Sequence, residues 1–178
     1  PLRHIEDYNL GKNEHLKKRG GVIMPMFQAD ALWLNFETIN ETDEEDYPIA
    51  IKIGTGKICA VSGDNWVSTL NRDPQDYVVV PDQPWIDGYN VGKDIVKQFV
   101  AAPLGQGYTV EEQLKSEADV GGIQIKVIPM KREFYDRLNQ SEEINVEYDE
   151  MVRFSMDCQL DMGLAAGGSM HQEIFEDP

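Results

Sequence analysis

The sequence predicts a mainly β protein, an antiparallel β-sandwich or barrel with two or three short helices. Short runs of alternating apolar and polar residues predict about eight to ten strands. Turn residues recur roughly every ten residues, which is typical of antiparallel sandwiches and barrels. No helical stretch is long enough for repeated crossovers between parallel strands, so a nucleotide-binding parallel sheet is not expected.

Length and charge set the domain organisation and exclude two classes of partner. The 178 residues, 41% of them apolar, suffice for one well-buried domain, which we place at 22–178 after a polar N-terminal arm at 1–21. The 16 basic and 32 acidic residues give a net charge of −16. This charge repels phosphate backbones and anionic lipid surfaces, and no apolar stretch could span a bilayer. We therefore expect neither a nucleic acid nor a membrane as partner.

The first half of the chain contains one clear hairpin. The run 27–36 is compatible with a strand or a helix, and the block 37–46, with six acids, predicts a solvated loop. Alternating residues at 49–53 and 58–61 flank the glycine-rich turn 54–57, which predicts a hairpin. The sequence Ser62-Gly63-Asp64 predicts the start of a short helix that runs to Leu70.

The second half repeats these patterns. A strand is expected at 77–80, a hairpin from 85–91 and 95–102, and a strand at 123–128. In the hairpin, Lys97 shares a face with Ile95, Phe99 and Ala101. Thr109 and Glu112 form a capping box before a helix at about 110–116, and a second helix is expected at 131–139. The most regular alternation spans 152–162, and 169–175 is expected to return as its partner strand.

The two cysteines favour a reducing compartment. Cys59 and Cys158 lie in predicted strands, and no pair has the spacing of a redox or metal motif. Two buried reduced thiols are favoured over a disulfide, so we expect a cytoplasmic location.

Candidate catalytic residues are few. The chain has no serine-nucleophile elbow and no zinc-protease signature. His171 and Glu173 are two residues apart and would share one face of a strand, where they could act as an acid/base pair or as metal ligands. A metal site needs three or four ligands, and only Asp177 lies nearby in the sequence. We therefore expect no metal and no cofactor, and we favour a surface pair.

Glycines before the first helix form a candidate anion site. Gly105 and Gly107 precede the capping box, where backbone N–H groups could face an anion. Glu111 and Glu112 already place negative charge at this helix start, which favours a purely structural cap.

The segment 81–89 is the main candidate for ligand binding. It combines the aromatic residues Trp85 and Tyr89 with the carboxylates of Asp82 and Asp87. An exposed aromatic platform with carboxylates would suit a sugar or a peptide. The competing interpretation is that the three tryptophans, Trp33, Trp66 and Trp85, fill the core.

Four blocks of the chain resemble bacterial proteins of unassigned function, and the resemblance would cover about residues 22–178. The blocks are 98–104, 105–113, 122–125 and 162–168. The resemblance implies a single cytoplasmic domain and transfers no functional residue.

The sequence therefore predicts a non-catalytic binding or interaction module for a small ligand or a protein partner. One alternative is a hydrolase or metal-dependent enzyme that uses carboxylates with His171. The second alternative is an oligomer-forming structural protein, which would present a continuous apolar surface.

Overall fold

A computed structural model describes residues 1–36, 47–92, 95–115, 120–141 and 169–171. Within these residues the protein is mainly β, with antiparallel sheets and two α-helices. None of the described sheets closes into a barrel. The antiparallel β class predicted from the sequence is confirmed, and the sandwich arrangement stays a prediction.

Most strands are short. The elements are, in order, β1 (Arg3–His4), η1 (Ile5–Asp7), η2 (Gly11–Arg19), β2 (Val22–Ile23), β3 (Ala31–Leu32), β4 (Leu34–Asn35), β5 (Ile49–Thr55), β6 (Ile58–Cys59), β7 (Val78–Val80), β8 (Trp85–Ile86), β9 (Gly88–Asn90), β10 (Ile95–Val100), α1 (Val110–Lys115), β11 (Ile123–Pro129), α2 (Arg132–Ser141) and β12 (Ser169–His171). One four-stranded sheet contains β11, β5, β6 and β7, and another contains β12, β10, β3 and β9. The pairs β1–β2 and β4–β8 form two smaller sheets.

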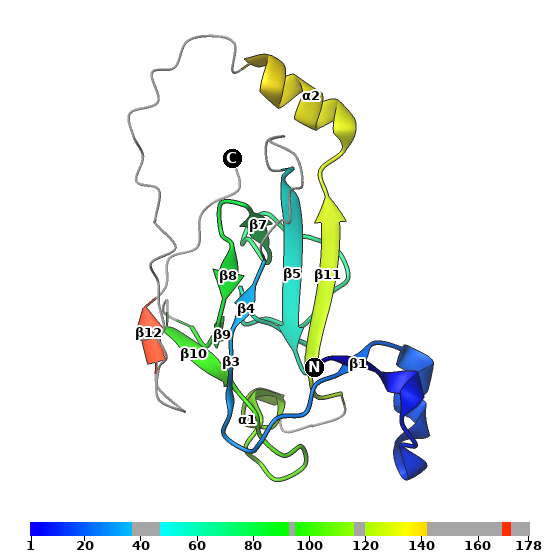
Figure 1. Ribbon diagram of the computed structural model, residues 1–178. Helices are drawn as coiled ribbons and strands as arrows, with labels where there is room; N and C mark the ends of the chain where they lie inside the picture. Colours follow the sequence, from blue (N-terminus) through cyan, green and yellow to red (C-terminus); the bar gives the residue numbers. More distant parts are fainter. Residues whose placement is uncertain (37–46, 93–94, 116–119, 142–168, 172–178) are drawn as a thin grey trace.

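The strand β5 is the centre of the first sheet (Figure 1). It pairs with β11 along its whole length, with β7 near its start and with β6 at its end. Gly56 and Lys57 join β5 to β6 with φ values of 54° and 66°, as a two-residue hairpin turn of the primed type requires. The predicted first hairpin is confirmed.

The prediction of a helix from Ser62 to Leu70 is wrong, because this segment folds back on β6. Its backbone groups bond across the hairpin: the Trp66 N–H donates to the Lys57 carbonyl, and the Cys59 N–H donates to the Asp64 carbonyl. These tertiary hydrogen bonds replace the bonds between successive turns that a helix would need.

Two lysines from one face of the first sheet hold the following segment, 66–76. Lys52 in β5 and Lys126 in β11 are register partners, and their ammonium groups donate to the carbonyls of Thr69 and Ser68, respectively. Lys52 also forms an ion pair with Asp76 and lies over the ring of Trp66, 5.5 Å from its centroid. Lys52 is fully buried, and a protein interior tolerates a buried charge only when that charge is paired in this way.

The second predicted hairpin is confirmed only in part, because 88–90 pairs with β10 whereas 85–86 forms the separate strand β8, which pairs with β4. β9 and β10 pair antiparallel, and Gly88 lies opposite Gln98. A Cβ atom on Gly88 would lie 2.3 Å from the Lys97 carbonyl oxygen, so the two strands approach more closely than any larger residue allows. β3 and β12 also pair with β10.

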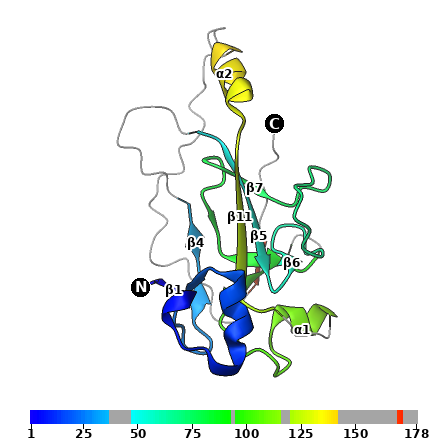
Figure 2. The ribbon, with the colours of Figure 1, turned by 90° about the vertical axis from the view of Figure 1, so that its right-hand side faces the viewer.

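The two predicted helices near 110 and 131 are confirmed as α1 and α2. They lie at opposite ends of the molecule, with α2 beyond the end of β11 (Figures 1 and 2). Tyr135 of α2 packs on Tyr47 with ring centroids 4.5 Å apart. The strand alternative for 27–36 is the correct one, since this run contains β3 and β4.

Side chains from both four-stranded sheets contribute to one core cluster. It contains Ile51, Ile53, Cys59, Ala60, Val61, Val78, Val80, Ile86 and Phe99. No tryptophan belongs to it: Trp66 and Trp85 are partly buried, and Trp33 is exposed. The interpretation that the three tryptophans fill the core is therefore wrong, because the cluster consists mostly of β-branched aliphatic residues.

Several predictions lie wholly or partly outside the described residues. These are the acidic block 37–46, Cys158, the strand 152–162 and most of its expected partner strand. The described part of that partner, β12, pairs with β10. The boundary between an arm at 1–21 and a domain from 22 also stays a prediction; the two sides of it are joined by the β1–β2 pair. Among the described helices, none is long and apolar enough to cross a membrane.

Candidate functional site

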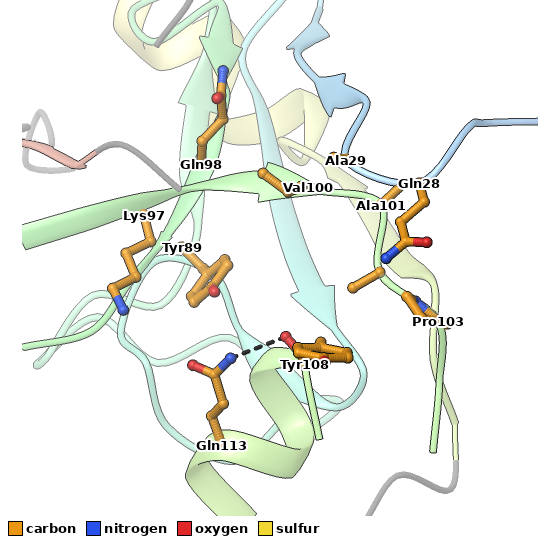
Figure 3. A pocket seen from close by; sticks show the side chains of 11 residues that line it. Gln28, Ala29, Tyr89, Lys97, Gln98, Val100, Ala101, Pro103, Tyr108 and Gln113 are labelled. Atoms are coloured by element: carbon orange, nitrogen blue, oxygen red, sulfur yellow. Dashed lines mark hydrogen bonds between the residues drawn. The ribbon is translucent and has the colours of Figure 1, made fainter. Parts of the chain in front are cut away.

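A depression lies where β9, β10, the start of α1 and the turn 27–30 meet (Figure 3). Its volume is about 280 Å³, close to the lower limit of small-molecule sites. The lining residues are Gln28, Ala29, Tyr89, Lys97, Gln98, Val100, Ala101, Ala102, Pro103, Tyr108 and Gln113.

The β9–β10 pair supplies one wall. Tyr89 and Lys97 are register partners, so their side chains leave the sheet on the same side. In Figure 3 both point toward α1, whereas Gln98 points to the opposite side of β10. Tyr89 also packs near Phe99, with ring centroids 6.1 Å apart, which ties this wall to the core.

The start of α1 supplies the opposite wall. The Gln113 backbone N–H donates to the Thr109 carbonyl, and its side-chain amide donates to the Tyr108 carbonyl at 2.9 Å. These bonds position Gln113 and Tyr108 together at the edge of the depression (Figure 3). Tyr108 is 63% exposed, so one part of its surface is free to contact a ligand.

The capping box of α1 occupies the candidate anion site. The Glu112 carboxylate accepts hydrogen bonds from the Gly107 N–H at 3.0 Å, the Thr109 N–H at 3.1 Å and the Thr109 hydroxyl at 2.8 Å. These bonds, that from Gly107 first, hold the pKa of Glu112 below its ordinary value. The Gly107 N–H thus has an acceptor within the protein, and neither Gly105 nor Gly107 lines the depression.

The turn 27–30 closes one side of the depression. Its ends bond to the chain after β10: the Ala29 N–H donates to the Ala101 carbonyl, and the Ala101 N–H donates to the Asp30 carbonyl. The Asp30 carboxylate also accepts from the Phe27 N–H at 2.7 Å. This arrangement places the amide side chain of Gln28 at the depression (Figure 3).

Only one of the four ligand-binding residues predicted within 81–89 lines the depression. Tyr89 does so, whereas Asp82 is exposed in the turn after β7, and Trp85 is partly buried in β8 opposite Asn35. Asp87 is 6% exposed and lies between β8 and β9. The structure therefore separates the residues that the sequence suggested as one platform.

Asp87 is a buried carboxyl group. Its Oδ1 atom has no hydrogen-bond partner among the described residues. Burial raises the pKa of Asp87 above its ordinary value, and a hydrogen bond from its own backbone N–H acts in the opposite direction. Folding therefore makes the Asp87 carboxyl group hold its proton more tightly than it does in the unfolded chain.

This raised pKa makes the stability of the protein depend on pH. The unfolded chain binds the proton of Asp87 less tightly, so the stability due to Asp87 is lost as the pH rises through the raised pKa. The variant Asp87→Asn does not titrate at this position. We expect its free energy of unfolding, minus that of the parent, to increase from acid to neutral pH. Urea unfolding at a series of pH values measures this difference.

The control for this experiment is Asp82→Asn, which removes one negative charge from an exposed position on the same segment. At each pH, the change in the free energy of unfolding that Asp82→Asn causes should be subtracted from the change that Asp87→Asn causes. A corrected difference that stays constant between acid and neutral pH would contradict the assignment.

The proposed acid/base pair is only half described. His171 lies in β12 with its backbone opposite Ile95, and Glu173 lies outside the described residues. Among the described residues, no group of three or more His, Cys, Asp or Glu side chains could hold a metal ion.

Of the eleven lining residues, sequence reasoning identified only Tyr89. The polar side chains that it missed on the side of α1 and of the turn 27–30 are Gln28, Lys97, Tyr108 and Gln113. A signal was present for Lys97, the one charged residue on an otherwise apolar strand face. Tyr108 was also adjacent to the glycines and the capping box. No sequence pattern pointed to Gln28 or Gln113, because the contact between their elements is tertiary.

The lining of the depression combines polar and apolar groups. Its lining offers two phenol groups, two amides that can point into it and one ammonium group, beside apolar side chains. Among the described residues, no carboxylate or imidazole belongs to this lining.

Comparison with protein-family models, curated proteins and solved structures finds no match to this chain. The resemblance to bacterial proteins of unassigned function stays a prediction.

Proposed function

We propose that this chain is a non-catalytic binding module that holds a small polyhydroxylated ligand, of the size of a monosaccharide, in the depression between β9, β10 and α1. One observation carries the proposal. Side chains from three separate parts of the fold converge on one depression of about 280 Å³. They are Tyr89 from β9, Lys97 from β10, and Tyr108 with Gln113 from the start of α1.

The mixed chemistry of the lining supports the ligand class. Gln28 and Gln113 carry amides that can both donate and accept hydrogen bonds, as sugar hydroxyl groups do. The tyrosine rings offer apolar faces for the C–H groups of a sugar ring. Val100 and Pro103 add apolar surface beside them.

Ligand-observed NMR with a panel of monosaccharides tests the proposal. We expect saturation transfer to at least one sugar, and we expect Tyr108→Ala to weaken its binding about tenfold, which corresponds to about 1.4 kcal/mol. Tyr108 is mostly exposed, so this substitution should leave the stability of the fold nearly unchanged.

The matched control is Trp33→Ala, which removes another exposed aromatic side chain away from the lining. This variant should bind like the parent. The proposal is wrong if no sugar of the panel binds, or if Trp33→Ala and Tyr108→Ala weaken binding equally.

A further inference from the structure

Among the described residues, Lys97 is the one formally charged side chain that lines the depression. The other lining residues are uncharged, and none is Asp or Glu. The chain as a whole has a net charge of −16, whereas the side chains of the lining carry a single positive charge. The depression therefore differs electrostatically from the rest of the protein.

The ammonium group of Lys97 is available to a ligand. Three other basic side chains form ion pairs: Lys17 pairs with Glu14, Lys52 with Asp76 and Arg132 with Asp136. The ammonium group of Lys97 forms no hydrogen bond or ion pair with another described residue, and the side chain is exposed. This ammonium group can therefore pair with an anionic group of a ligand.

We infer that the ligand carries a carboxylate group that pairs with Lys97, which makes a hexuronate the matching class of sugar. The inference rests on the proposed function, because it assigns a charge to the ligand of that same depression. Tyr89, the register partner of Lys97 in β9, lies beside it and can donate its hydroxyl hydrogen to the same group. Burial raises the pKa of Tyr89, so this hydroxyl remains protonated at neutral pH.

A carboxylate fits better than a phosphate. A phosphate dianion usually needs several cationic side chains or backbone N–H donors around it. Here one ammonium group lines the depression, and the nearby Gly107 N–H donates to Glu112. The net charge of −16 also repels a dianion more strongly than a monoanion.

Titration of matched sugar pairs tests the inference. We expect the parent to bind glucuronate about fivefold more tightly than glucose, or galacturonate more tightly than galactose, at low ionic strength. Added NaCl should reduce this preference, because Lys97 is exposed. Lys97→Gln should bind the acid and the neutral sugar equally, and Lys97→Arg should keep the preference. Lys131→Gln, which removes an exposed lysine outside the lining, should behave like the parent.

The outcomes separate the two proposals. Equal binding of the acid and the neutral sugar by the parent would overturn the inference and leave the binding function in place. A preference that survives in Lys97→Gln, or inorganic phosphate that competes more strongly than glucuronate, would also overturn it. Binding of neither member of any pair would overturn the proposed function and the inference together.

Discussion

Replacing Lys52 by Met should lower the free energy of unfolding by about 3–5 kcal/mol. Lys52 is fully buried, and its ammonium group pairs with the nearly buried carboxylate of Asp76 and donates to the Thr69 carbonyl at 2.8 Å. Methionine fills a similar volume but leaves Asp76 as a buried charge without its partner. Chemical denaturation monitored by tryptophan fluorescence measures the loss and also reports on Trp66, which lies beside Lys52.

Two further variants identify the cause of this loss. Lys126→Met removes the register partner of Lys52, which donates to the Ser68 carbonyl and pairs with no described carboxylate, so about 1 kcal/mol is expected. Adding Asp76→Asn to Lys52→Met removes the unpaired charge and should recover part of the stability. Equal losses for Lys52→Met and Lys126→Met, or no recovery in the double variant, would contradict the role of the buried pair.

Replacing Gly88 by Ala should cost about 3 kcal/mol. The added Cβ would lie 2.3 Å from the Lys97 carbonyl oxygen and 2.7 Å from Cγ1 of Val96, so β9 and β10 must separate. The Phe99 N–H, which donates to the Asp87 carbonyl at 2.7 Å, should then exchange faster with solvent. The exchange rate of this amide should be measured together with the free energy of global unfolding. Faster exchange would show that the loss of stability lies in the wall that carries Tyr89 and Lys97.

Gly92→Ala is the control within the same hairpin. A Cβ there meets no atom within 4 Å, although its φ of 100° makes alanine strained. We expect a loss of about 1–2 kcal/mol from this strain and no faster exchange of the Phe99 amide. A parent-like exchange rate in Gly88→Ala would show that the strands tolerate the extra methyl group.

Local patterns in the sequence predicted most of the elements correctly. The two hairpins followed from alternation around turn residues, and α1 followed from Thr109 and Glu112, because strand periodicity and capping depend on residues close in sequence. The prediction of a helix at 62–70 failed for the opposite reason. Its capping signal was local, but its hydrogen bonds go to Lys57 and to β6, so tertiary contacts overrode the helix.

The site was less predictable than the elements. The sequence by itself determined the antiparallel β class, the placement of Tyr89 on a hairpin strand and the self-capped start of α1. Only the tertiary structure decided that Asp87 is buried, that Trp85 stays apart and that Tyr89 and Lys97 face Tyr108 and Gln113. The physical reason is that alternation fixes which residues share a face, whereas the packing of strand, turn and helix decides what that face meets.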